Sequence, residues 1–244
     1  MDARSRSTLA RYNLKISLAL PLTVLILIIY LPSSNSGLAS DESYHILPYN
    51  SKPYGLKYGE WTEKWAQWIQ SIPQDRNPLL DPTGRFCGDG QSNPNVFFLA
   101  GTLGGKAERT CIISSDKALF FPIFRSDAIN ATDFESVDAD KLISGNQDAL
   151  TLLVAQIDNK SLTDFTTLRT QSQYFNLTYP EDNNTDFKSG LLPIAISNGT
   201  WIMLAPLDPG YHQLKFQGVV VDPDIGDQEN LAVDITYHID VTAS

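Results

Sequence analysis

The sequence predicts a mainly β protein: an antiparallel β-sandwich of the jelly-roll kind, with one tryptophan-faced amphipathic helix and a second, short helix. Three observations support this fold class. Short apolar runs separated by turn residues recur along the chain, the last of them alternates apolar and polar residues, and one stretch near residue 60 has helical periodicity. Many short strands between turns are typical of a sandwich, which the helix is expected to cover.

The first 39 residues are expected to be a signal peptide or an N-terminal membrane anchor. Four basic residues precede the apolar run 16–31, and Gly37-Leu38-Ala39 resembles a signal-peptidase site. As a helix this run would span about 24 Å, short of the roughly 30 Å hydrocarbon core. Cleavage is therefore favoured, and membrane association through 16–31 is the alternative. Both interpretations place the rest of the chain outside the cytoplasm, secreted or at the cell surface.

After residue 39 the chain is strongly acidic. It holds 14 Lys and Arg against 27 Asp and Glu, a net charge of −13 (14 − 27). Such a surface repels nucleic acid and argues against a phosphate-backbone partner. Residues 40–57 lack periodicity and are interpreted as a linker. Residues 58–244 are long enough for a single extracytoplasmic sandwich domain with a full core.

The domain is predicted to begin with an amphipathic helix that ends before Pro73, because a residue that precedes proline avoids the α region. The apolar residues of this helix share one face: Trp61, Trp65, Trp68, Ile69 and Ile72. This face is expected to pack in the core, since tryptophan buries a large area. A platform on which sugar rings stack is the alternative.

A turn-rich loop, 74–94, follows the helix, and a loop of this length is usually functional or pinned. It contains Cys87, and Cys111 is the other cysteine of the chain. In an exported protein an even pair predicts a disulfide, which would stabilise the fold by roughly 3 kcal/mol. Two free thiols that bind a metal are the less favoured alternative.

Eight apolar or alternating runs are predicted strands, in this order: Val96–Ala100, Glu108–Ile113, Ala118–Phe124, Leu150–Ile157, Gln173–Tyr179, Thr200–Pro206, Tyr211–Val221 and Leu231–Val241. Hairpins are expected at Gly104-Gly105 and at 208–210, and a turn is expected at 158–160. A capping box at 132–135 predicts the second helix. The last strand should have one apolar and one solvated face.

Seven segments carry a resemblance to a known family: YGEW…W…W…SIP (58–73), NPLLDPTG…C…GQS (77–92), VFFLAGT (96–102), RTC (109–111), KALFFPI (117–123), WIMLAPLDPG (201–210) and DITYHIDV (234–241). In these segments the chain resembles a widespread family of uncharacterised exported proteins from bacteria and archaea. The resemblance implies export and a single domain, and it carries over no catalytic residue. The long basic N-region and the number of glycosylation motifs depart from the family pattern, which leaves anchoring open.

One acidic loop suggests a ligand. Asp222, Asp224, Asp227 and Glu229 place four carboxylates within eight residues, and oxygen-rich loops of this kind bind Ca²⁺. The spacing is not that of an EF-hand, and a solvated hairpin loop is the favoured interpretation.

No catalytic residue is assigned, because the chain has neither a Gly-x-Ser-x-Gly elbow nor a His-Glu-x-x-His motif. Both histidines of the strands, His212 and His238, are expected to be solvated, although a triad of Ser92, His238 and an aspartate stays open. A hydrolase would instead use carboxylates near the loop 77–92. Its test is whether one cleft combines a histidine with the following residues: Asp75, Asp81, Arg85 and Asp89.

Five Asn-x-Ser/Thr motifs are candidate N-glycosylation sites: Asn130, Asn159, Asn176, Asn183 and Asn198. Their clustering predicts a sugar-coated half if the host glycosylates exported proteins. The leading functional hypothesis is a non-enzymatic binding or structural module of the cell surface or envelope, with a surface polymer or envelope component as its partner. The alternative is a secreted hydrolase that acts on carbohydrate or ester.

Overall fold

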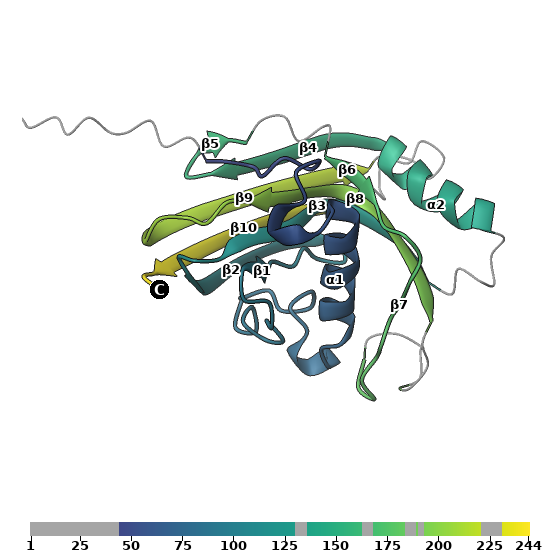
Figure 1. Ribbon diagram of the computed structural model, residues 1–244, viewed down its shortest axis with the longest axis horizontal. Coiled ribbons are helices and arrows are strands. Elements are labelled where there is room, and N and C mark those ends of the chain that lie inside the picture. The colour runs from purple at the N-terminus through teal and green to yellow at the C-terminus, as the bar shows by residue number, and fades with distance from the viewer. Residues whose placement is uncertain (1–43, 130–135, 163–167, 184–188, 190–192, 221–230) are drawn as a thin grey trace, which may run out of the picture. The chain divides into compact units, whose positions relative to one another are not determined.

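A computed structural model describes residues 44–129, 136–162, 168–183, 189, 193–220 and 231–244. Two β-sheets and two α-helices make up most of the described chain, which confirms the mainly β, sandwich-like fold class (Figure 1). The elements in chain order are η1 (Pro53–Gly55), α1 (Tyr58–Gln70), η2 (Gln74–Arg76), β1 (Val96–Phe98), β2 (Gly105–Ser114), β3 (Ala118–Ile129), α2 (Ser136–Asp148), β4 (Leu150–Ile157), β5 (Lys160–Ser161), β6 (Arg169–Gln171), β7 (Phe175–Asn176), β8 (Ile194–Leu204), β9 (Gly210–Val220) and β10 (Leu231–Thr242).

The strands form two mixed sheets. Sheet A has the order β1-β3-β8-β6, with β7 also paired to β8, and sheet B has the order β2-β10-β9-β4-β5. Strand β1 runs parallel to β3, and β2 runs parallel to β10, whereas the other pairs are antiparallel. The expectation of purely antiparallel sheets missed these two pairs, because parallel partners are not joined by a tight turn that the sequence could reveal.

The two sheets share an apolar core. Alternate side chains of β3 and β8 meet those of β9 and β10, and the rings of Phe121 and Phe216 stack with their centroids 5.0 Å apart. Along β10 the predicted face is buried: Val233, Ile235, Tyr237, Ile239 and Val241. The period-2 pattern therefore predicted this strand and its orientation correctly.

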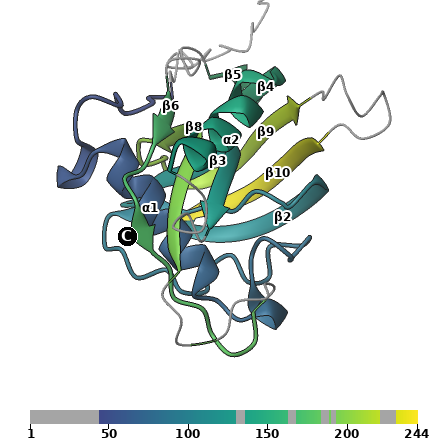
Figure 2. The same cartoon turned by 90° about the vertical axis from the view of Figure 1, so that its right-hand side faces the viewer.

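Helix α1 packs on the opposite face of sheet A. Trp65 lies edge-on to Trp201 of β8 with the ring centroids 5.4 Å apart, and Trp201 stacks on Phe120 of β3 at 5.1 Å. Helix α2 packs against Ala128 and Ile196 near the other ends of β3 and β8. Figure 2 shows the order sheet B, sheet A and α1. One face of sheet B consequently has no helix on it in the described chain.

Two predicted hairpins are wrong. Strands β1 and β2 flank Gly104-Gly105, but β1 belongs to sheet A and β2 to sheet B. Strands β8 and β9 flank 208–210 and are divided between the sheets in the same way. Turn residues mark where a strand ends, and they do not say whether the chain returns to the same sheet or crosses to the other. The turn expected at 158–160 is confirmed, with Asp158 and Asn159 at positive φ, and in the structure it joins β4 and β5 as a hairpin.

The interpretation of 40–57 as a linker is wrong for the residues that the structure describes. Residues 44–47 lie along the end of β8: Ile46 bridges Leu204, the amide of Leu47 donates to the carbonyl of Met203 at 2.8 Å, and the amide of Ala205 donates to the carbonyl of His45 at 2.9 Å. A segment without periodicity can still add to a sheet edge through its backbone. We call residues 44–52 the N-terminal strap.

Two smaller elements were predicted in part. A second helix exists at Ser136–Asp148, and the capping box at 132–135 lies outside the described residues. The strand expected at 173–179 is reduced to Phe175–Asn176, which pair with Ala195 and Ile194 of β8. Phe175, Leu177 and Tyr179 are nevertheless buried on one side, as their alternation indicates.

Candidate functional site

The loop 74–94 is pinned to β2 at several points. Cys87 and Cys111 form the predicted disulfide. Gly84 has φ +84°, and a Cβ placed on it would meet the carbonyl oxygen of Thr110 at 2.5 Å, so only glycine allows this approach. The amide of Thr110 also donates to the carbonyl of Thr83 at 2.9 Å. The loop therefore covers the edge of sheet B.

Asp81, one of the candidate catalytic carboxylates, has a structural role in this loop. Its carboxylate accepts hydrogen bonds from the amide and hydroxyl of Thr83 at 2.8 and 2.7 Å, and from the amide of Phe86 at 2.9 Å. Burial acts to raise the pKa of Asp81, but these bonds outweigh it and lower the pKa below its ordinary value. The carboxylate is thus held ionised as the acceptor of a turn.

Arg109 is a buried residue that the sequence did not single out. Its guanidinium donates to the carbonyl oxygens of Asp81 at 2.7 Å and Ala100 at 2.6 Å, and to the hydroxyl of Tyr237 at 2.9 Å. These bonds join the loop, the end of β1 and β10. The only sequence signal is its place on the inward face of β2, between Ala107 and Cys111.

The residues named for a hydrolase are not brought together with a histidine in one cleft. Asp75, Arg85 and Asp89 do line one surface hollow of about 520 Å³, together with Arg76 and Phe86, but no histidine lines it. Arg76 forms an ion pair with Asp89, with Nε 2.7 Å from Oδ2. The carboxylates of the loop therefore lie apart from His212 and His238.

The two histidines have carboxylate partners of their own. His238 lies on the outward face of β10, as expected, between Glu108 and Tyr211 rather than beside the exposed Ser92. His212 is buried, contrary to the expectation, because its side chain falls on the inward face of β9. Its Nδ1 is 2.7 Å from the carboxylate of Asp158, which also accepts the hydroxyl of Tyr44.

The tryptophan face is core, as predicted, and offers no platform for sugars. Trp61, Trp65 and Trp68 are at most 6 % exposed. Each indole N–H donates to a backbone carbonyl, namely those of Pro53, Leu99 and Asp89.

The acidic loop lies outside the described residues, and so does Asn130. The four carboxylates concerned are Asp222, Asp224, Asp227 and Glu229. Within the ranges that the structure describes, no three His, Cys, Asp or Glu side chains are grouped so as to hold a metal ion.

The described glycosylation motifs differ in accessibility. Asn159 and Asn176 are exposed, and Asn183 is half-buried, with its amide donating to the carbonyl of Pro180. Asn198 is buried, and its amide nitrogen donates to Gln171 at 3.1 Å while its oxygen accepts from Arg169 at 3.3 Å. A glycan on Asn198 is incompatible with this packing.

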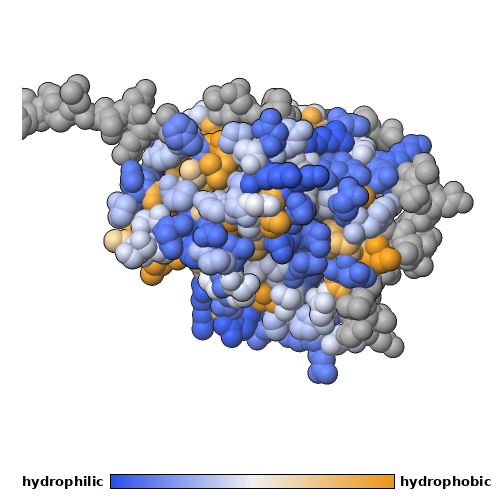
Figure 3. Space-filling model, viewed as in Figure 1, coloured by the Kyte–Doolittle hydropathy of each residue, from blue (hydrophilic) through white to orange (hydrophobic). Residues whose placement is uncertain are grey.

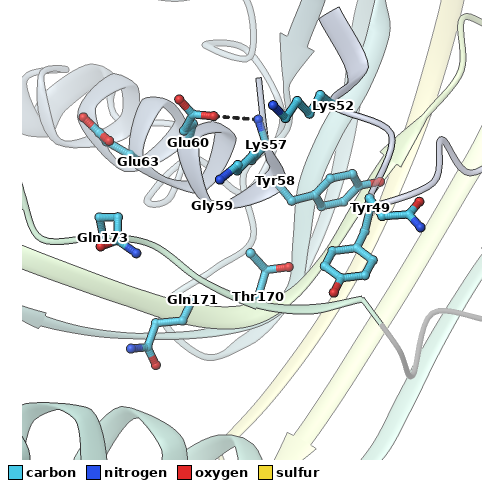
Figure 4. Close-up of a pocket in the computed structure, with 11 residues that line it drawn as sticks. Tyr49, Lys52, Lys57, Tyr58, Gly59, Glu60, Glu63, Thr170, Gln171 and Gln173 are labelled. Atoms are coloured by element: carbon cyan, nitrogen blue, oxygen red, sulfur yellow. Dashed lines mark hydrogen bonds between the residues drawn. The ribbon is translucent and has the colours of Figure 1, made fainter. Parts of the chain in front are cut away.

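A cleft of about 520 Å³ opens between the N-terminal strap, the first turns of α1 and strand β6. Figure 4 shows Lys52, Lys57, Glu60 and Glu63 on one side, Thr170, Gln171 and Gln173 on the other, and the ring of Tyr49 toward the right of the view. We call this the strap cleft. Its lining residues are Tyr49, Asn50, Lys52, Lys57, Tyr58, Gly59, Glu60, Glu63, Thr170, Gln171 and Gln173.

Close backbone contact sets the width of the strap cleft. A Cβ on Gly59 would meet the carbonyl oxygen of Gln171 at 2.9 Å, so glycine lets α1 approach β6. Lys52, which lines the cleft, and Tyr54, two residues further along the chain, have φ of 50° and 53°. Non-glycine residues rarely adopt this conformation, and such strain concentrates at binding sites.

The strap cleft has both apolar and polar walls, and its formal charges balance. Lys52 and Lys57 face Glu60 and Glu63, and the carboxylate of Glu60 accepts the backbone amide of Lys57 at 2.8 Å. The ring of Tyr49 is 49 % exposed and rests edge-on against buried Tyr58, with the centroids 6.2 Å apart. The cleft therefore offers a fixed aromatic surface beside amide, hydroxyl and charged groups.

A second cavity, of about 320 Å³, lies where the chain crosses between the sheets at 101–103. Arg125 and Asp127 line it as an ion pair, and Arg125 also lies over the ring of Trp65 at 4.7 Å. Burial lowers the pKa of Arg125 to about 10. Apolar side chains form most of the remaining wall, and the contact of Arg125 with Trp65 joins β3 to α1.

The face of the molecule seen in Figure 3 carries no broad apolar patch. Hydrophobic residues appear there as separate spots among hydrophilic ones. Scattered exposed apolar residues are ordinary on a soluble domain, so they mark no docking surface on this face.

Comparisons with known proteins leave the family open. No family model matches the chain, and no curated protein matches it. One solved structure, of a cysteine protease inhibitor from Entamoeba histolytica, covers 60 % of this chain and 96 % of its own at 13 % identity. Its TM-score of 0.22 is too low to support an argument about fold or function. In the described ranges, no helix has the length and apolar character needed to cross a membrane.

Proposed function

We propose that this chain is an exported, non-enzymatic binding module of the cell surface or envelope, and that the strap cleft binds a neutral, hydroxyl-rich polymer such as a polysaccharide. The half-exposed ring of Tyr49, in a charge-balanced cleft with both apolar and polar walls, carries this proposal. Export rests on the N-terminal sequence and on the resemblance to exported proteins.

The chemistry of the strap cleft matches such a polymer. A sugar ring has an apolar face that packs on an aromatic ring, and its hydroxyls both donate and accept hydrogen bonds. Asn50 and Gln173 supply amides that do both, and Lys52, Lys57 and Glu63 supply charged donors and acceptors. Because two positive charges face two negative ones, the cleft has no net charge that would select an ionic ligand.

A titration of the full secreted chain with a soluble glucan, mannan and xylan tests the proposal, with a polyuronate as the charged comparison. We expect calorimetry to detect binding to at least one neutral polymer. Tyr49→Ala should weaken this binding by about tenfold or more, as for an aromatic at the centre of an interface.

Tyr211→Ala is the matched control, because Tyr211 is exposed but lies on sheet B, outside the strap cleft. It should leave the affinity unchanged. Absence of binding to all neutral polymers, or equal losses in the two variants, would exclude the strap cleft as a polysaccharide site.

A further inference from the structure

Three side chains form a hydrogen-bonded chain on the outward face of sheet B. His238 lies in the centre on β10, with its Nε2 2.6 Å from a carboxylate oxygen of Glu108 on β2. Its Nδ1 is bonded to the hydroxyl of Tyr211 on β9. The rings of Tyr211 and His238 also stack, with centroids 5.9 Å apart and planes 22° apart.

The strand register builds this arrangement. His238 lies opposite Thr110 of β2 and Gln213 of β9, so Glu108 and Tyr211 are its diagonal neighbours on the same face. By the same register its remaining outward neighbours are Ile112, Lys215, Thr236 and Asp240. The charged groups around the imidazole are therefore Glu108, Asp240 and Lys215.

The hydrogen bonds assign a direction for proton transfer. An ionised carboxylate only accepts, so Nε2 of His238 carries a hydrogen toward Glu108. In the neutral ring Nδ1 is then an acceptor, and the phenol of Tyr211 donates to it. Tyr211 thus has a base bonded to its hydroxyl, and a carboxylate orients that base, as in an activated nucleophile.

Exposure distinguishes Tyr211 from the other tyrosines in the part of the chain that the structure describes. Its side chain is 65 % exposed, against 49 % for Tyr49, 43 % for Tyr174 and 41 % for Tyr54. The buried tyrosines, Tyr58 and Tyr237 among them, cannot meet an outside reagent. Oxidation of a phenol removes an electron and a proton, so an attached base assists it.

We propose that Tyr211 is a site of oxidative cross-linking, where a peroxide-driven oxidant joins two copies of this chain through a dityrosine bond. Each Tyr211 loses one electron to the oxidant and its phenolic proton to Nδ1 of His238. Two phenoxyl radicals form a carbon–carbon bond ortho to the oxygens, and the two ring hydrogens move to the oxygens as the rings regain aromaticity. One H₂O₂ accepts the two electrons and two protons and becomes two waters.

The test treats the full secreted chain with H₂O₂ and a peroxidase, and measures dityrosine fluorescence, covalent dimer on reducing gels, and the cross-linked peptides. We expect the peptides to contain Tyr211, and Tyr211→Phe to lose most of the dimer. Tyr174→Phe is the matched control and should keep it. Tyr49 or Tyr174 as the main linked residue, or more than half of the dimer left in Tyr211→Phe, would overturn the proposal.

His238→Gln separates proton acceptance from positioning. Glutamine keeps a hydrogen-bonding side chain at this place but does not take up the proton. We expect the initial rate of dityrosine formation to fall about tenfold or more. This minimum is smaller than the roughly hundredfold to ten-thousandfold that a positioned base usually contributes. Equal initial rates for the two proteins would overturn the role of His238.

Discussion

At the scale of single residues, buried polar side chains explain how irregular segments are fixed. Arg109 holds three segments through two carbonyl oxygens and one hydroxyl. Asp81 and Asp158 each accept several hydrogen bonds from turns and strands. These residue types usually suggest catalysis when they are read from a sequence, and here they stabilise the fold.

The first prediction concerns Arg109. Arg109→Lys should lower the free energy of unfolding by about 3 kcal/mol, because lysine lacks the planar fork that reaches Asp81, Ala100 and Tyr237 together. Urea unfolding measures the change. Arg85→Lys, on the exposed side of the loop, should change it by less than about 0.5 kcal/mol. Similar values for the two variants would contradict the role of Arg109.

The second prediction concerns Asp158. Burial acts to raise its pKa, but hydrogen bonds from Tyr44, the amide of Gln213 and His212 outweigh it and lower the pKa below the ordinary 3.8. The folded state therefore favours the ionised carboxylate. The resulting stabilisation is present above the ordinary pKa and is lost as the pH falls through the lower folded value.

The stability difference between wild type and Asp158→Asn should accordingly be full near about pH 6 and should shrink as the pH falls below about 4. Urea unfolding across this range measures it. Asp116→Asn, at an exposed position, should follow the wild-type pH dependence. A constant difference between wild type and Asp158→Asn at every pH would show that Asp158 gains nothing from ionisation.

At the scale of elements, helix α1 completes the apolar core on the face of sheet A that is opposite sheet B. Its tryptophan face covers the side of sheet A that sheet B does not reach. Trp65→Ala should lower the free energy of unfolding by about 3–5 kcal/mol, since it leaves a cavity between α1 and Trp201 and removes a bond to Leu99. Ile112→Ala, at a 66 % exposed side chain, is the control. A loss under about 1 kcal/mol for Trp65→Ala would indicate that the helix does not depend on this residue.

Periodic segments were predictable from the sequence, and pairings were not. The run Leu150–Ile157 was identified with its observed bounds, and so was the buried face of Leu231–Val241. The pairing of β2 with β10 joins residues that are far apart in the sequence, such as Gly105 and Val233, and no local pattern indicates it. The chain does bend at Gly104-Gly105, but it crosses there from sheet A to sheet B.

At the scale of the whole described domain, the proposed site is assembled by the fold. The strap cleft combines Tyr49 and Lys52 with Thr170 and Gln173, which are separated by more than a hundred positions in the sequence. None of these residues belongs to a motif, so sequence analysis had no signal for the cleft. It had a signal for the disulfide, because two cysteines allow a single internal pairing.

The most direct test of the central claim is to find which residues a bound polysaccharide contacts. Backbone amide signals of the full chain, recorded by NMR during titration with the neutral polymer that binds most tightly, would locate the contact. We expect the largest changes at residues 49–63 and 170–173, and none at the outward residues of β2, β9 and β10. Changes confined to sheet B or to the loop 74–94, with the strap cleft unaffected, would contradict the proposal.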